Sequence, residues 1–309
     1  METAAVLGGA LSLAGGMIWL ERRLLALWQD RLGPNRVGPF GLLQVAADLI
    51  KLLAKEDWVP PFADRTLFVL APALTAVAAL AALAVIPFAP GWGVADLDVG
   101  LLFFLGASAL GVYGVLLGGW ASRSKYALLG SLRVGAQVLS YEVFMGLSLL
   151  GVAALAGSFR MSDIVEAQKD GWFVLPQLPG FLVFLVAGIA ETRRSPLDLP
   201  EAESELVAGF HAEYSGFKFA LFFVGEYVGM ATIASVAVTC FLGGWRGPLL
   251  PPAAWFFIKL APLLALFILV RAALPRPRYD QLLRFGWTAM LPLALLNLAG
   301  AALWRAARA

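Results

Sequence analysis

The chain alternates between long apolar runs and shorter polar connections, which is the pattern of a polytopic membrane protein. An α-helix needs about 20 mostly apolar residues to cross the hydrocarbon core of a bilayer. Eight runs approach or exceed this length, and the fifth is short unless it extends to Leu175 or Thr192. The predicted spans are approximately Thr3–Ala26, Leu67–Phe88, Val99–Trp120, Ser131–Gly157, Pro179–Glu191, Phe217–Leu242, Ala253–Val270 and Phe285–Trp304.

The composition supports this prediction. Hydrophobic residues make up 60% of the 309 residues and charged residues only 14%, whereas a soluble domain carries roughly 25% charged residues. We therefore expect an all-α membrane protein that forms a single transmembrane domain over residues 1–309. The N-terminus has no charged region or cleavage pattern typical of a signal peptide, so the first run is predicted to be a retained span.

The distribution of Lys and Arg predicts the orientation in the membrane. Seventeen of these residues fall in the first, third, fifth and seventh connections, against five on the opposite side. Because positively charged loops stay in the cytoplasm, these four connections are expected to be cytoplasmic. An even number of spans then places both termini on the outer side of the membrane.

The first cytoplasmic connection, about residues 27–66, contains an amphipathic segment. A polar stripe runs along Leu42–Lys55, and apolar residues occupy the remaining positions. This pattern is typical of a helix that lies in the membrane interface rather than crossing it. The polar stripe consists of Gln44, Asp48, Lys51 and Lys55.

The fifth connection, about residues 192–216, is rich in carboxylates. Seven of the 21 acidic residues fall between Glu191 and Glu226. Asp198 followed by Pro200 is typical of a helix start, after which Glu201 and Glu205 lie four residues apart, where like charges repel. Such a pair would titrate together if buried, although a run of charges is more often a solvated face.

Three carboxylates, Glu142, Glu191 and Glu226, lie within or at the end of predicted spans. A charge at the centre of a membrane helix costs about 2.5–3.5 kcal/mol on insertion scales, so such residues usually face the bundle interior and mark proton or ion routes. Hydrogen bonding between helices is the alternative. For Glu191, simple neutralisation by Arg194, about one turn further on, is a second alternative.

The remaining composition excludes several kinds of chemistry. With one cysteine, Cys240, and one histidine, His211, the chain offers neither a disulfide framework nor a cysteine-ligated or histidine-rich metal site. We expect no metal, flavin or iron–sulfur cluster in this chain and no catalytic residue in the redox sense. The net charge of +2 does not favour nucleic acid as a partner. Lys259 lies within the seventh span and either snorkels or pairs with another helix.

Several long motifs resemble one known family. The chain is similar to the H subunit of bacterial NADH:quinone oxidoreductase, or respiratory complex I, the equivalent of mitochondrial NADH dehydrogenase subunit one. The resemblance covers nearly the whole chain. Its motifs are Glu21-Arg22-Arg23, Arg31-Leu-Gly-Pro-Asn-Arg-Val-Gly-Pro-Phe-Gly-Leu-Leu-Gln44, Gly118-Gly-Trp-Ala-Ser-Arg-Ser-Lys-Tyr126, Leu132-Arg-Val-Gly-Ala-Gln137 with Ser140-Tyr-Glu142, and Asp198-Leu-Pro-Glu-Ala-Glu-Ser-Glu-Leu-Val-Ala-Gly-Phe-His211 with Glu213-Tyr-Ser-Gly216.

The resemblance implies a proton-translocating subunit without redox cofactors that is inactive alone. Its substrate would be a quinone (ubiquinone or menaquinone), and its partners would be peripheral quinone-site and iron–sulfur subunits on the cytoplasmic side, small membrane subunits and lipid. The residues implied to line the quinone tunnel are Glu21, Arg22, Arg36 and Asp48. The carboxylates implied in proton coupling are Asp198, Glu201, Glu203, Glu205, Glu213, Glu142, Glu191 and Glu226.

Other functions remain open from the sequence. The nearest is the homologous membrane subunit of an energy-converting hydrogenase, or of a quinone reductase fed by ferredoxin or deazaflavin. A secondary proton-coupled transporter is a different class, but the inverted repeats expected of one are not evident. A passive membrane anchor, in which the carboxylates only hold partners, is the third alternative.

Overall fold

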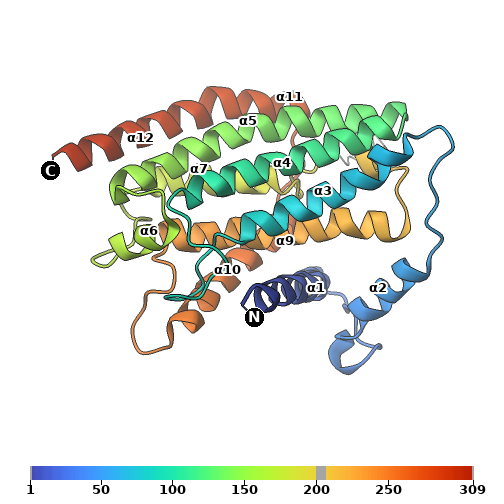
Figure 1. The fold of residues 1–309 in the computed structure, drawn as a ribbon, viewed down its shortest axis with the longest axis horizontal. Coiled ribbons are helices and arrows are strands. Elements are labelled where there is room, and N and C mark those ends of the chain that lie inside the picture. The colour runs from blue at the N-terminus through green and yellow to red at the C-terminus, as the bar shows by residue number, and fades with distance from the viewer. Residues whose placement is uncertain (1, 200–206, 308–309) are drawn as a thin grey trace.

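The computed structural model describes residues 2–199 and 207–307, and this part of the chain contains helices and no strands. Figure 1 shows the long helices gathered into one bundle, with the first two helices set apart from it. The helices are α1 (Glu2–Trp28), α2 (Gln44–Ala54), α3 (Arg65–Leu83), α4 (Gly100–Ala121), α5 (Lys125–Ala156), α6 (Met161–Ala167), α7 (Leu178–Glu191), α9 (Gly216–Phe241), α10 (Pro252–Ala273), α11 (Tyr279–Phe285) and α12 (Leu291–Ala306), with short turns η1 (Pro39–Gly41), η2 (Gly209–His211) and η3 (Gly286–Met290).

Within the described residues, six helical segments are long and apolar enough to cross a membrane. They are α3, α4, α5, α9, α10 and the continuous stretch Tyr279–Ala306. The predicted all-α membrane fold is therefore confirmed. The count of eight spans stays a prediction, because α1 is not among the six and α7 has only 14 residues.

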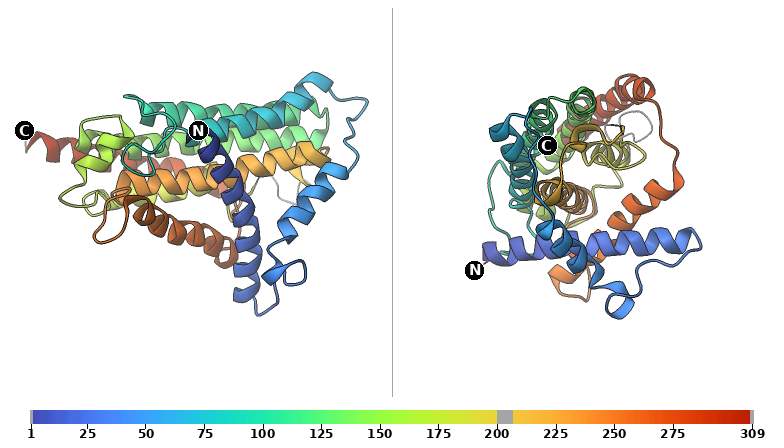
Figure 2. Two further views of the ribbon diagram at one scale, coloured as in Figure 1. Left: turned by 60° about the horizontal axis from the view of Figure 1, so that its bottom comes forward. Right: turned by 90° about the vertical axis from the view of Figure 1, so that its right-hand side faces the viewer.

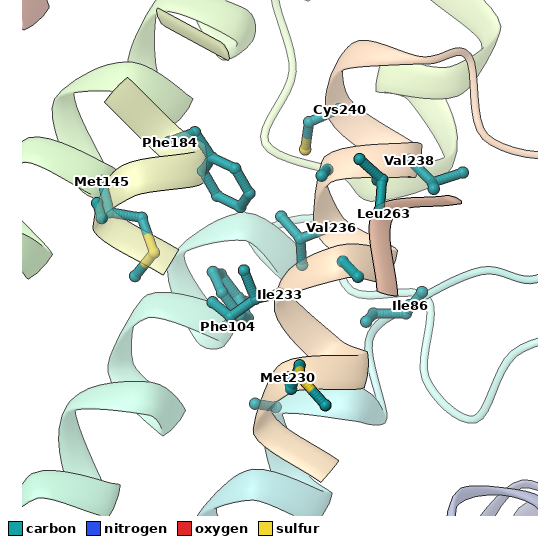
Figure 3. Close-up of a cluster of buried hydrophobic side chains, with 14 of the residues drawn as sticks. Ile86, Phe104, Met145, Phe184, Met230, Ile233, Val236, Val238, Cys240 and Leu263 are labelled. Atoms are coloured by element: carbon teal, nitrogen blue, oxygen red, sulfur yellow. The ribbon is translucent and has the colours of Figure 1, made fainter. Parts of the chain in front are cut away.

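The helix α9 occupies the centre of the bundle. In its most apolar stretch 72% is buried, compared with 28% for Tyr279–Ala306, which packs along the outside. Figure 3 shows the apolar core around α9, where Ile233 and Val236 lie near Phe104 of α4 and Phe184 of α7. Because α9 contacts helices on several sides, a polar side chain on it faces protein rather than lipid.

The first two helices do not run along the bundle, although α1 packs on it through buried residues such as Ala14 and Met17. Figure 2 shows α1 crossing the long axis of the bundle, with α2 beyond it. The helix α2 begins two residues after the predicted Leu42 and has no buried residue, and Leu49, Ile50 and Leu53 are exposed. This exposure is compatible with a helix that lies in the membrane interface. That location stays a prediction.

Candidate functional site: a buried ion network

Arg194, three residues beyond the end of α7, is the centre of a buried ion network. Its side chain is only 6% exposed, its Nη1 lies 3.0 Å from Glu21 Oε1, and its Nε lies 2.5 Å from Glu226 Oε1. The guanidinium also lies over the ring of Tyr227, 4.2 Å from the centroid. One cation therefore joins the segment after α7 to both α1 and α9.

Glu21 receives further partners from two helices. The hydroxyl of Tyr227 donates to Glu21 Oε2 at 3.0 Å, and Arg271, in the last turn of α10, donates to Glu21 Oε1. Glu21, Glu226, Arg194 and Arg271 thus contribute two negative and two positive charges. This balance matters because an unpaired charge in the protein interior is strongly destabilising.

Charge pairing also keeps the central guanidinium protonated. Burial alone would lower the pKa of Arg194, but the negative charges of Glu226 and Glu21 outweigh that effect and raise its pKa above the ordinary value. Arg194 Nη2 is buried and has no hydrogen-bond partner among the residues that the structure describes. Nε makes a close ion-pair contact with Glu226 but no well-directed hydrogen bond within the described chain, so Nη2 is the donor of Arg194 that is left to bind water or a ligand atom.

A cavity of about 60 Å³ adjoins this network. Its walls come from α3, α4, α5 and α9 together with the C-terminal end of α7, and most of them are apolar. Its polar lining consists of Thr75, Ser108, Glu191, Thr192, Arg193, Glu226 and Thr232. Glu226 belongs to both features, because it pairs with Arg194 and lines the cavity.

Among the residues that the structure describes, no ion pair of this kind involves the other two predicted membrane carboxylates. Glu142 Oε1 and Glu191 Oε2 are buried and have no hydrogen-bond partner in the described part of the chain. Buried polar atoms of this kind are usually satisfied by ordered water. The structure does not support neutralisation of Glu191 by Arg194, since Arg194 pairs with Glu21 and Glu226 instead.

The four residues predicted to line a quinone tunnel are only partly brought together. Arg22 Nη1 lies 2.5 Å from Asp48 Oδ2, which ties α1 to α2, and Gln44 Nε2 donates to Asp48 Oδ1 at 2.9 Å. Glu21, the neighbour of Arg22, points into the buried network. Arg36 is exposed in the connection between α1 and α2, and no hydrogen bond or ion pair in the described chain joins it to the others.

The Arg22–Asp48 contact helps to lower the pKa of the Asp48 carboxyl group. Burial acts to raise the pKa of Asp48, but hydrogen bonds from Gln44 and Arg22, with the positive charges of Arg22 and Lys51, outweigh it and lower the pKa. A second ion pair lies just beyond the C-terminal end of α2, between Asp57 and the buried Lys218 of α9. The middle of α2 is therefore tied to α1, and the chain that follows α2 is tied to the bundle.

The predicted acidic loop is described only in part. Asp198 is buried and forms an ion pair with Arg276, and its Oδ1 has no hydrogen-bond partner within the described residues. Glu213 is half-buried. The remaining loop carboxylates, Glu201, Glu203 and Glu205, lie outside the described residues, as does the helix start predicted at Pro200.

The end of this loop packs tightly on the bundle. A Cβ on Gly130 of α5 would lie 2.8 Å from the Cα of Gly209 in η2, so only glycine permits this approach. Beyond it, the ring of Tyr214 stacks on Phe68 of α3 with centroids 4.0 Å apart. His211 packs edge-on against Phe210, which agrees with a structural role for the single histidine.

Sequence reasoning did not assign Arg271, Arg276 or Tyr227 to the site. Arg271 and Arg276 entered only as loop cations, and their carboxylate partners are 250 and 78 residues away. The available signal was Glu21 itself, an acidic residue near the end of a predicted span, because a buried carboxylate requires a cation from elsewhere in the fold. Lys259 also has an unexpected partner set, because its Nζ donates to the carbonyls of Leu242, Gly244 and Arg246.

Comparison with known proteins gives a consistent result over the whole chain. Residues 1–302 match the family described as NADH dehydrogenase. The chain is also 59% identical, over 299 residues, to a protein of Methylococcus capsulatus that is named as the H subunit of NADH-quinone oxidoreductase. This alignment covers 96% of the chain and 95% of that relative. The chain belongs to the NADH dehydrogenase family.

Proposed function

We propose that the chain is the membrane subunit of a proton-pumping NADH:quinone oxidoreductase, in which it forms the quinone path and links quinone reduction to proton translocation. The name and the high identity of the Methylococcus capsulatus relative support the type of complex. The observation that carries the coupling role is that Glu226 belongs to both the Arg194 network and the cavity. A change of charge in the Arg194 network therefore changes the electrostatic potential in the cavity, and a change of charge in the cavity affects the network.

The proposed quinone path approaches the network from the side of α2. Arg271 and Arg276 bind Glu21 and Asp198 while remaining 41% and 45% exposed. Their exposed guanidinium groups can bind the oxygens of a reduced, negatively charged quinone. The electrons for this reduction come from another subunit, and carboxylates of this chain relay the two protons that the quinone takes up.

The effect of quinone reduction would pass through the network because the quinone anion and the carboxylates compete for the same cations. A quinone anion that draws Arg271 from Glu21 leaves Glu21 more dependent on Arg194. Arg194 then shifts towards Glu21, and Glu226 loses part of its compensating charge. A buried carboxylate with less compensating charge is stabilised by taking up a proton. In this proposal Glu191, which lines the same cavity, gives its proton to the Glu226 oxygen and is left as a carboxylate.

The remaining parts of the proposal concern assembly and location. The chain acts within a complex and not alone, in a bacterial inner membrane with both termini outside. Peripheral quinone-site and iron–sulfur subunits dock on its cytoplasmic connections, and small membrane subunits contact its sides. Isolation of the complex under mild conditions should therefore recover an NADH-oxidising arm with this chain, and recovery of a nickel–iron subunit instead would favour a hydrogenase.

The coupling role is tested by Glu226→Gln in the assembled complex, reconstituted into vesicles. The variant should lower the number of protons pumped per NADH oxidised more than it lowers the quinone reductase rate. The matched control is Glu166→Gln. This change removes the charge from an exposed carboxylate on α6 that forms an ion pair with Arg246. If both variants pump as the wild type does, Glu226 has no part in coupling and the passive-anchor alternative gains support.

A further inference from the structure

Gln137 of α5 bridges both ends of the segment that carries Arg194. The side chain is completely buried, and its Nε2 donates to Ala190 O at 3.0 Å and to Leu197 O at 2.8 Å. Ala190 is the penultimate residue of α7, and Leu197 directly precedes Asp198. A single amide from α5 therefore ties together the two ends of an eight-residue stretch, 190–197.

This stretch contains the charged residues of the site. Glu191 and Arg193 line the cavity, and Arg194 pairs with Glu21 and Glu226. Carbonyls at the end of a helix lack intrahelical partners, and the backbone around Leu197 is a turn without a helix to support it. Within the stretch, Arg193 N donates to Ala190 O and Leu197 N donates to Arg194 O. These two local bonds do not join its ends, whereas Gln137 contacts a carbonyl at each end from outside.

A second buried glutamine shows what a purely structural amide does in this fold. Gln168 donates through Nε2 to Ile164 O and Thr239 O, and its Oε1 accepts from the backbone N–H groups of Phe173 and Gly243. All of its hydrogen-bonding capacity serves backbone groups around the C-terminal end of α9. Thr239 lies 13 residues beyond Glu226, about 20 Å along the helix.

Gln137 differs from Gln168 in its oxygen. Gln137 Oε1 is buried and has no hydrogen-bond partner among the described residues, and the same is true of Glu142 Oε1 and Glu191 Oε2. Unpaired buried acceptors of this kind are places where ordered water is expected. The amide thus holds backbone on one side and presents an open acceptor on the other.

We infer that Gln137 is a positioning residue for proton coupling, which fixes segment 190–197 so that Arg194 and Glu191 keep their places between the ion network and the cavity. This inference rests on the proposed function. Gln137 touches neither quinone nor the exchanging proton in this scheme. It acts through the backbone of the segment that carries the charged groups.

The test compares Gln137→Met with Gln168→Met in the assembled complex. Both changes remove a buried amide that binds two carbonyls, so both reduce stability. Only Gln137→Met should raise amide hydrogen exchange within 192–198, by about tenfold for the loss of a buried hydrogen bond. It should also lower the protons pumped per NADH to less than half, whereas Gln168→Met keeps the wild-type ratio.

A third variant, Gln137→Glu, provides a second test in case the Gln137→Met protein does not fold. It keeps the chain length and the Oε1 atom but replaces the donating Nε2, so it should reproduce the increased exchange and the lowered proton ratio. The inference is overturned if exchange in 192–198 is unchanged in both Gln137 variants. It is equally overturned if exchange rises while the proton ratio and the KM for quinone stay at wild-type values, because Gln137 is then merely structural.

The same experiments separate this inference from the proposed function. If Glu226→Gln leaves the proton ratio unchanged, the proposed coupling role itself fails. If Glu226→Gln lowers the ratio and the Gln137 variants do not, only the positioning role of Gln137 is lost.

Discussion

Arg194 Nε and Glu226 Oε1 lie 2.5 Å apart, which joins the segment after α7 to the buried face of α9. The same guanidinium reaches Glu21 on α1. Three parts of the chain that are far apart in sequence therefore share one cation, and its removal would leave two buried carboxylates with reduced compensation.

Arg194→Met should therefore be among the most destabilising single changes in the chain. Removal of one partner from a buried ion pair typically costs about 3–5 kcal/mol. We expect a lowered thermal transition of the complex and reduced assembly, measured by differential scanning fluorimetry and native gels. The comparison variant is Arg160→Met, since Arg160 forms an exposed pair with Asp96 and such pairs contribute about 0–1 kcal/mol. Equal effects of the two variants would contradict the central role of Arg194.

Lys259→Met should destabilise the opposite end of α9. The Lys259 ammonium group satisfies three carbonyls at 2.6–3.0 Å and lies 4.7 Å from the ring centroid of Trp172. A buried carbonyl without a partner costs about 1–3 kcal/mol, so a total loss of about 3 kcal/mol or more is expected in thermal unfolding of the complex. Lys169→Met is the control because Lys169 is exposed, and it should leave the transition unchanged.

The ion pair between Arg22 and Asp48 gives a prediction for pH. Folding lowers the pKa of Asp48 from its ordinary value of 3.8, so its stabilising contribution is complete above that value and is lost as pH falls through the lowered one. From about pH 5 to about pH 8 Asp48 therefore stays charged, and in the proposed quinone path its effect on the KM for a long-chain quinone should be constant.

Asp48→Asn should raise that KM by a similar factor at every pH in this window, with little change in kcat. Asp98→Asn, at a carboxylate whose side chain is 92% exposed, is the control and should leave KM unaltered. A wild-type KM that rises between neutral pH and pH 5, and that no longer does so in Asp48→Asn, would place the pKa of Asp48 inside the window and refute the prediction.

Two glycine substitutions should have opposite signs. Gly130→Ala places a methyl group 2.8 Å from Gly209 Cα, so the end of the acidic loop must move, and overpacking of this kind typically costs about 1–3 kcal/mol. Gly106→Ala, within α4, places its methyl group in open space and should stabilise that helix by about 0.5–1 kcal/mol. Thermal transitions of the two complexes check the contrast, and a neutral Gly130→Ala would show that η2 does not rest on α5.

The membrane class and most of the helices could be predicted from the sequence because they depend on local properties. An apolar run of sufficient length must satisfy its backbone hydrogen bonds internally, so it forms a helix wherever it crosses lipid. The observed α4 and α9 accordingly begin and end within one residue of the predicted Val99–Trp120 and Phe217–Leu242. The amphipathic α2 followed equally directly from its polar stripe.

The partners of the charged residues followed only from the tertiary structure. Glu21 and Arg194 are 173 residues apart, and nothing in either local sequence indicates the other. The local sequence favours Arg194 as a partner of Glu191, because a helix brings residues about one turn apart together. However, α7 ends at Glu191, so the following chain turns Arg194 towards α1 and α9. Local hydrophobicity determined which segments are helices, whereas the packing of those helices decided which charges meet, because ion pairing depends on distance in space and not along the chain.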